Sequence, residues 1–251
     1  MSVSVPAVLR PPGLRRGASA LAMALLMAGG LCSLAAPARA AGSGVPASQP
    51  LVALLDDHVA RTRPSARAHR IETIAARRPL TRMRTVLPVL RHATGRGGDS
   101  WVRVRLPGRP NGHAGWIRAA GTRRTATGWH VSVDLSARRV TVHRDGRVKR
   151  RFQAVIGTAS TPTPRGRFFI EEAVTLSSQD AGGPFALATS ARSNVLQEFH
   201  GGPGQIALHG TNHLSDPLGT AASHGCVRLG TRAITWLVRR VGRGVPLTIS
   251  Q

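Results

Sequence analysis

Cysteine is scarce in this chain. Its 251 residues contain two, Cys32 and Cys226. Cys32 lies in an N-terminal segment that we expect to be removed, so the mature chain would keep one thiol and could form no internal disulfide. In an exported protein, a single thiol pairs with another molecule, is buried and inert, or acts as a nucleophile.

Acidic residues and lysine are also few. The chain has 35 Lys and Arg against 11 Asp and Glu, for a formal net charge of +24, and Lys149 is its single lysine. Such a positive field attracts anionic wall polymers, lipid surfaces or nucleic acid, although coding bias and an ordinary solvated surface would give the same composition. Because we expect the chain to be exported, and because the arginines are spread along it and not interleaved with aromatics, we predict no nucleic-acid binding and favour anionic cell-wall polymers.

The long apolar run is confined to the first forty residues. Arg10, Arg15 and Arg16 precede an uncharged run from Ala18 to Ala36, and Ala38-Arg39-Ala40 has the small residues that a signal peptidase recognises. Residues 1–40 are therefore predicted to be a cleaved signal peptide, and the chain to be exported to the periplasm, the cell wall or the medium. A retained membrane anchor is the alternative, and it would be the chain's only membrane contact.

Residues 41–78 are predicted to be a linker containing one short helix. Ala, Gly, Ser and Pro dominate up to Gln49, which is typical of a flexible lead. From Leu51 to Arg61, apolar residues then recur at helical spacing. The helix is too short to form a domain.

Residues 79–125 have the pattern of a small β-module. Short candidate strands at Thr85–Leu90, Trp101–Leu106 and Gly115–Ile117 are separated by turn residues, and the second alternates apolar with basic. Their order resembles a bacterial SH3-like barrel. Trp101 and Trp116 are expected in its core, with a binding groove as the alternative. Residues 122–128 are predicted to be a connection.

Residues 128–251 are predicted to form a mainly β domain with one helix near the C-terminus. His130–Leu135 and Arg139–His143 alternate as half-buried strands, and a turn at Asp145-Gly146 leads into a third, Arg151–Gly157. Residues 175–204 show few regular elements, and loops of that length are often functional, so we expect a cap over a pocket there. The helix is indicated by apolar residues at Ile234, Leu237, Val238 and Val241, with Thr231 as its N-cap and Gly242 as its stop.

Two segments carry the candidate chemistry. His209-Gly210-Thr211-Asn212 follows a short apolar stretch, and Ser223-His224-Gly225-Cys226-Val227-Arg228 comes shortly after it. A cysteine attacks as the thiolate, so it needs a base, and His209 is the candidate. Alone, each residue has a structural explanation, and a zinc site would lack a fourth ligand. We therefore predict a nucleophile–base pair and no metal.

Together these segments resemble the active-site signature of the L,D-transpeptidases, the YkuD-like domain that cross-links bacterial peptidoglycan. Gly157-Thr158 and the Thr161–Phe168 segment resemble a second signature of that domain. The resemblance extends from near Trp129 to the C-terminus and implies a YkuD-like β-sandwich or barrel. It further implies that Cys226 attacks the amide before the terminal D-alanine of a tetrapeptide stem, with no cofactor, and that carbapenems acylate the thiol.

The other site residues take roles from this resemblance and from their types. Gly210 would orient His209 through its backbone carbonyl. The amides of Gly225 and Cys226 would stabilise an oxyanion, with Ser223 and His224 bracing their turn. Substrate binding is assigned to Thr211 and Arg228, whose guanidinium suits a carboxylate. The positive end of the following helix is expected to lower the pKa of the thiol.

Three alternatives remain open. Water instead of an amine would resolve the thioester in an L,D-carboxypeptidase, which needs the same residues. A non-enzymatic wall-binding module would leave Cys226 idle. A basic nucleic-acid binder would show steep salt dependence, and predicted export argues against it.

Overall fold

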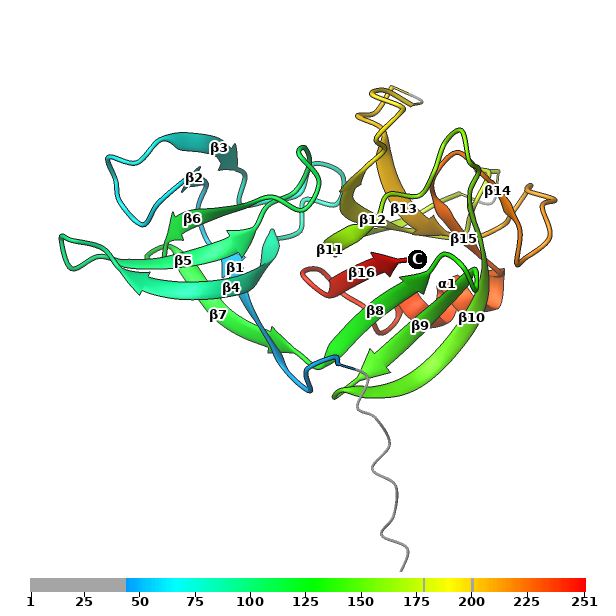
Figure 1. Ribbon diagram of the computed structural model, residues 1–251, viewed down its shortest axis with the longest axis horizontal. Coiled ribbons are helices and arrows are strands. Elements are labelled where there is room, and N and C mark those ends of the chain that lie inside the picture. The colour runs from blue at the N-terminus through cyan, green and yellow to red at the C-terminus, as the bar shows by residue number, and fades with distance from the viewer. Residues whose placement is uncertain (1–43, 178, 200) are drawn as a thin grey trace, which may run out of the picture. The chain divides into compact units, whose positions relative to one another are not determined.

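The computed structural model describes residues 44–177, 179–199 and 201–251, which form two β-sheets and one helix (Figure 1). The predicted signal peptide and Cys32 lie outside these residues. Within the described part of the chain, no helix is both long enough and apolar enough to span a bilayer.

The first sheet has seven strands in the order β3-β2-β6-β5-β4-β1-β7, and every pairing is antiparallel. Its strands are β1 (Gln49–Leu54), β2 (His58–Arg61), β3 (Arg70–Ile74), β4 (Val86–Thr94), β5 (Ser100–Arg105), β6 (Ala114–Arg118) and β7 (Thr122–Thr127). The three strands predicted for residues 79–125 are thus present as β4, β5 and β6. The same sheet also contains β1, β2 and β3, which precede residue 79, and β7, which extends past residue 125.

Two sequence-based predictions in this region are wrong. The helix predicted over Leu51–Arg61 is the strand pair β1 and β2, because the apolar run ending at Leu54 is buried on both faces of the sheet, a pattern that periodicity does not distinguish from a helix. The connection predicted for residues 122–128 contains β7, whose polar sequence is exposed and which forms by pairing along all of β1.

The second sheet has nine strands in the order β14-β10-β15-β13-β12-β11-β16-β8-β9, and β10 closes it by pairing with β9 as well as with β15. Its strands are β8 (Trp129–Asp134), β9 (Arg139–Arg144), β10 (Arg147–Gly157), β11 (Gly166–Thr175), β12 (Phe185–Arg192), β13 (Gln205–His209), β14 (Ala221–Ser223), β15 (Val227–Leu229) and β16 (Pro246–Ser250). The predicted mainly β fold with one helix is confirmed. The stretch 175–204 is more regular than expected, since β12 runs through it.

The one helix of the described residues, α1 (Thr231–Val238), follows β15 closely. Its N-cap is Gly230 without a side-chain cap, and the predicted cap Thr231 instead donates to Asn212 Oδ1 at 3.3 Å. Its C-cap is Arg239, before the predicted stop at Gly242. Ile234 and Leu237 are buried on its inner face, as the spacing predicts.

Each sheet has its own apolar core, and β11 contributes to both. Phe168 packs among the residues of the second sheet and α1, whereas its neighbour Phe169 packs among those of the first sheet. Successive side chains of a strand point to opposite faces, so this one strand joins the two cores. Trp101 is buried, as predicted, and Trp116 is partly exposed.

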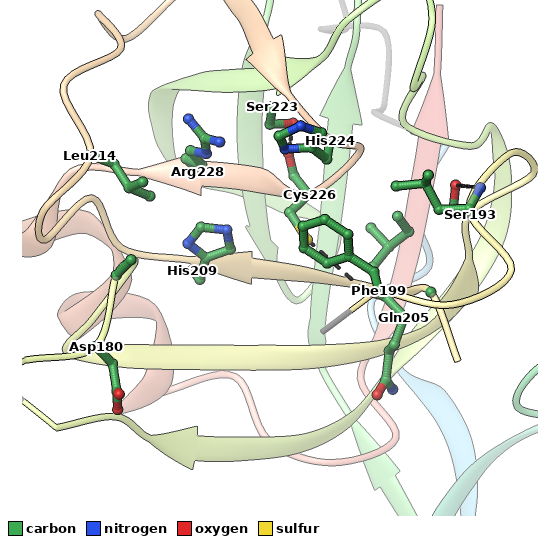
Figure 2. Close-up of a pocket in the computed structure, with 14 residues that line it drawn as sticks. Asp180, Ser193, Phe199, Gln205, His209, Leu214, Ser223, His224, Cys226 and Arg228 are labelled. Atoms are coloured by element: carbon green, nitrogen blue, oxygen red, sulfur yellow. Dashed lines mark hydrogen bonds between the residues drawn. The ribbon is translucent and has the colours of Figure 1, made fainter. Parts of the chain in front are cut away.

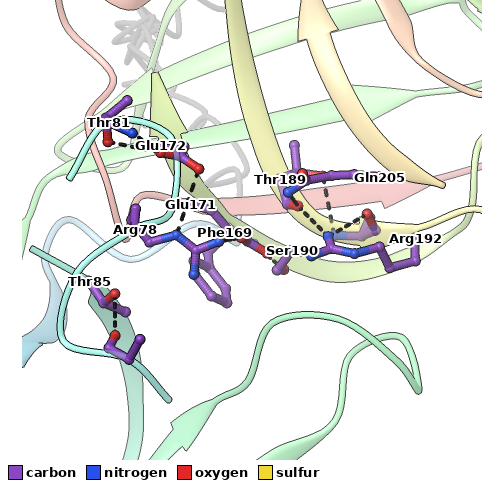
Figure 3. Close-up of polar contacts among 12 residues, drawn as sticks. Arg78, Thr81, Thr85, Phe169, Glu171, Glu172, Thr189, Ser190, Arg192 and Gln205 are labelled. Carbon is purple, nitrogen blue, oxygen red and sulfur yellow. Dashed lines mark hydrogen bonds and ion pairs between the residues drawn. The ribbon is translucent and has the colours of Figure 1, made fainter. Parts of the chain in front are cut away.

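Buried charges also link the two sheets (Figure 3). Arg78, from the segment after β3, pairs with Glu171 of β11, which also accepts from Arg192 Nη2 at 3.3 Å. The next residue, Glu172, accepts from the backbone nitrogen and hydroxyl of Thr81 at 3.0 and 2.8 Å. Burial lowers the pKa of Arg192 to about 10, a value at which the guanidinium stays charged at neutral pH.

Candidate active site

The parallel pairing of β13 with β15 assembles the candidate site. Leu208 is opposite Val227, and His209 is opposite Arg228. Cys226 precedes β15 by one residue and therefore shares a face with Arg228, two positions on. His209, Cys226 and Arg228 all line one cavity of about 530 Å³, into which their side chains project (Figure 2). The structure thus brings together the three residues predicted as base, nucleophile and carboxylate binder.

The Cys226 thiol is held against β13. Its Sγ accepts a hydrogen bond from the Ala207 amide at 3.4 Å and lies 4.0 Å from the carbonyl oxygen of Gln205. Burial raises the pKa of Cys226, although the Ala207 hydrogen bond and the charge of Arg228 oppose that shift. Desolvation is the largest of these effects, so the net shift is upward, and a lowering contribution from α1 stays a prediction.

His209 is fixed by backbone. Its Nδ1 lies 2.8 Å from the carbonyl oxygen of Gly210, the group predicted to orient it. A carbonyl only accepts, so Nδ1 carries the proton in this bond and Nε2 keeps its lone pair. Burial lowers the pKa of His209, Arg228 acts in the same direction, and hydrogen bonds with the backbone of Gly210 and Gly182 oppose it. The ring is therefore neutral at neutral pH.

The turn before Cys226 is tied together by Ser223. Its Oγ donates to the carbonyl oxygen of Cys226 at 2.6 Å and accepts from the Gly225 amide at 3.1 Å. Gly225 has φ of +113°, a conformation that L side chains rarely adopt. The Gly225 amide, expected to face an oxyanion, is thus already bonded to Ser223.

A second tie comes from threonines of the second signature, for which the sequence predicted no role at the site. Thr163 Oγ1 accepts from the Gly157 amide at 2.9 Å and donates to the carbonyl oxygen of Gly225 at 2.8 Å. The carbonyl oxygen of Ser223 accepts from the Thr158 amide at 3.0 Å and the Thr161 hydroxyl at 3.2 Å. The threonines of the second signature therefore brace the turn before Cys226. The alternation of threonine with proline over residues 161–164 was the sequence signal that could have indicated this role.

Arg228 has an unpredicted partner in Asp216, whose Oδ2 pairs with its Nη1. Arg228 is 8% exposed, and its Nε has no hydrogen-bond partner among the described residues. One edge of the guanidinium is thus held by Asp216. That Nε atom is itself buried.

Two loops border the cavity within the stretch where a cap was expected. Asp180 and Ala181, between β11 and β12, line one part, and Ser193, Leu196 and Phe199, after β12, line another. The Phe199 ring centroid lies 5.4 Å from that of His224.

Not every predicted site residue lies in the cavity. Thr211 belongs to the turn after β13 and is not among the described residues that line the cavity. Leu214, from the same turn, does line it. Within the described part of the chain, no cluster of three or more His, Cys, Asp or Glu side chains is arranged to hold a metal ion.

Comparison with known proteins places this domain in a class of acyltransferases. Residues 128–249 match the model of the YkuD family, the L,D-transpeptidase catalytic domain. Two proteins named putative L,D-transpeptidase YkuD are similar: that of Bacillus subtilis is 29% identical over 123 residues, and that of Bacillus licheniformis is 30% identical over 122. In both cases the match covers 49% of this chain and 66% of the relative.

Solved structures give a weaker likeness. An L,D-transpeptidase from Mycobacterium smegmatis is 19% identical and matches 66% of this chain and 99% of its own, with a TM-score of 0.38. The assignment therefore rests on the sequence matches. Residues 128–249 of this chain belong to the L,D-transpeptidase catalytic-domain family.

Proposed function

We propose that this chain is an exported peptidoglycan L,D-transpeptidase that forms 3→3 cross-links through a thioester on Cys226. One observation carries the proposal: the register of β13 against β15 brings an imidazole, a thiol and a guanidinium into one cavity of a domain that belongs to this family. Export and action at the cell wall follow from the predicted signal peptide and the substrate class.

In the proposed first half-reaction, the thiol and the imidazole both begin neutral. As Sγ attacks the carbonyl carbon between the third stem residue and D-alanine, the thiol proton passes to Nε2 of His209. The negative charge on the carbonyl oxygen is stabilised by backbone N–H, for which we propose the Cys226 amide. Protonated His209 then gives its proton to the departing D-alanine nitrogen, and the thioester remains.

The second half-reaction reverses these proton transfers. An acceptor amine from a neighbouring stem attacks the thioester, Nε2 takes a proton from the nitrogen, and the proton returns to sulfur as the new amide forms. Gly210 and Gly182 keep the imidazole in the tautomer that both steps need. We propose that the guanidinium of Arg228, which lines the cavity and is held at Nη1 by Asp216, binds a donor carboxylate.

The test is product analysis with a synthetic tetrapeptide donor and an amine acceptor. Wild type should release D-alanine and join the two peptides, and Cys226→Ala should do neither. Release of D-alanine without joining would indicate the carboxypeptidase alternative. Equal activity of the two proteins would contradict a thioester mechanism. If a folded wild type released no D-alanine, the wall-binding alternative would be favoured.

A further inference from the structure

The loop between β5 and β6 reaches from the first sheet to the active-site loop after β12. Arg109, in this loop, donates to three carbonyl oxygens of the segment 193–204: Nη1 to Pro203 at 2.9 Å, and Nη2 to Ser193 at 2.8 Å and Leu196 at 3.1 Å. One guanidinium therefore joins the start, the middle and the end of that segment. Among side chains, only the planar guanidinium of arginine has enough N–H donors in a fixed geometry to bond these three carbonyl oxygens.

Asn111 makes a second attachment two residues later. Its Oδ1 accepts from the Arg192 amide at 2.8 Å, and its Nδ2 donates to the Arg192 carbonyl oxygen at 2.7 Å and to Asn194 Oδ1 at 2.9 Å. The side-chain amide thus satisfies the backbone where β12 ends and the active-site loop begins. The Gly108 amide adds a bond to the carbonyl oxygen of Ser190 at 3.2 Å.

The attached segment is also closed on itself at its base. The Ser193 amide donates to the carbonyl oxygen of Gly204 at 2.7 Å. Gly204 has φ of +61°, and a Cβ there would overlap the carbonyl of Leu196 and lie 3.2 Å from Arg109 Nη2. Glycine at this position is what lets the two ends and the guanidinium meet.

The other side of the same segment forms a wall of the cavity that holds Cys226. Ser193, Leu196, Phe199 and Gly204 line it, and Phe199 packs against His224, two residues from the thiol (Figure 2). A ligand in the cavity would therefore contact one side of this segment. Arg109 and Asn111, from the loop between β5 and β6, hold its other side.

We propose that Arg109 and Asn111 are positioning residues for substrate binding, and that they make the N-terminal region a structural part of the active site. They hold the described residues of this segment, 193–199 and 201–204, in the conformation that completes the cavity wall. If only a fraction of molecules held this conformation, the apparent affinity for the donor would fall by that fraction. The identity of the ligand rests on the proposed function, whereas the ordering of the loop does not.

The test compares Arg109→Ala, Arg109→Lys and Asn111→Ala with Arg96→Ala. Arg96 is an exposed arginine in the turn between β4 and β5, so its loss gives the same change of charge. Hydrogen exchange, followed by mass spectrometry, measures the ordering of peptides from residues 193–204. Steady-state kinetics with the tetrapeptide donor separate KM from kcat.

In Arg109→Ala, we expect amides of residues 193–204 to exchange about tenfold faster while peptides from β8 and β9 are unchanged. KM should rise about tenfold, with kcat within about twofold of wild type. Arg109→Lys should lie between the two, because lysine keeps the charge and loses the fork. Asn111→Ala should change exchange and KM in the same direction, and it serves as the test if Arg109→Ala does not fold.

Unchanged exchange in residues 193–204, or equal effects in Arg96→Ala, would overturn the proposal. Because exchange needs no substrate, it decides the inference even if the wild type proves inactive as a transpeptidase. Conversely, an active wild type whose KM is unaffected by Arg109→Ala would leave the proposed function in place and remove this inference.

Discussion

The Nδ1 of His209 lies 2.8 Å from the carbonyl oxygen of Gly210, one residue along the same strand end. This contact determines which ring nitrogen carries a proton and leaves Nε2 free to accept one. A carboxylate in that place would stabilise the imidazolium strongly and raise the pKa of His209. The neutral carbonyl of Gly210 raises that pKa by less than burial lowers it. His209, the proposed base, is therefore neutral at neutral pH, and so is the buried thiol of Cys226.

Gly182→Ala should lower kcat/KM by displacing the imidazole of His209, the proposed base. Gly182 has φ of +86°, and a Cβ there would overlap the His209 ring. We expect kcat/KM to fall by about 100-fold, because small displacements of a reacting group are costly. Gly98→Ala is the matched control, since Gly98 has φ of +82° with nothing within 4 Å of its Cβ. Similar losses in both variants would mean that backbone strain, and not contact with His209, is responsible.

The pH dependence of Cys226 should differ from that of a thiolate–imidazolium pair. Burial raises the thiol pKa and lowers the His209 pKa, so the neutral pair persists from below pH ~6.5 to above pH ~8.5, the ordinary values of the two groups. Alkylation by iodoacetamide should therefore accelerate with a midpoint above ~8.5. The value of kcat/KM should fall only on the acid side, below ~6.5. An alkylation midpoint below pH 7 would show that the resting pair is ionised.

Thr163→Val should weaken the nucleophile turn. It leaves the buried Gly157 amide and Gly225 carbonyl without their shared hydroxyl, at a cost of about 1–3 kcal/mol for each unsatisfied group. We expect kcat about tenfold lower as the turn loosens. Thr163→Ser keeps the hydroxyl and should retain activity, and the exposed Thr125→Val should be neutral. Equal kcat for the valine and serine variants would show that the hydroxyl plays no part.

Glu171→Gln should destabilise the fold. Glu171 is 1% exposed, and its carboxylate pairs with both Arg78 and Arg192, which would be left without their shared counter-charge. Breaking a buried pair in this way costs about 3–5 kcal/mol, measurable by chemical denaturation. Glu198→Gln removes the same charge at an exposed position and should stay within about 0.5 kcal/mol of wild type. A similarly small effect for Glu171→Gln would mean that water replaces the lost pair.

The proximity of His209, Cys226 and Arg228 was predictable because the three residues are close in sequence. His209 lies at the end of an apolar strand and Cys226 just before another, so adjacent strands suffice to bring them together. Thr163, Asp216 and Arg109 were missed because their roles depend on contacts that spacing does not reveal. Arg109 and Leu196, for example, are 87 residues apart.

The fold was predictable where strands alternate and unpredictable where they do not. His130–Leu135 alternates and is β8, whereas β1 is continuously apolar and was taken for a helix. β7 has no apolar pattern because it is exposed on its edge of the sheet, and only its pairing with β1 defines it. The local sequence therefore predicts a strand well when one of its faces is buried, but it does not predict which strands pair with each other.

Intact-mass spectrometry after incubation with a carbapenem tests the central claim most directly. Attack of Cys226 on the β-lactam would open the ring and leave the whole carbapenem on the protein, as one covalent adduct per chain. We expect that adduct on wild type and none on Cys226→Ala, with both proteins shown to be folded. An adduct that persists in Cys226→Ala, or a folded wild type that acquires none, would contradict the account.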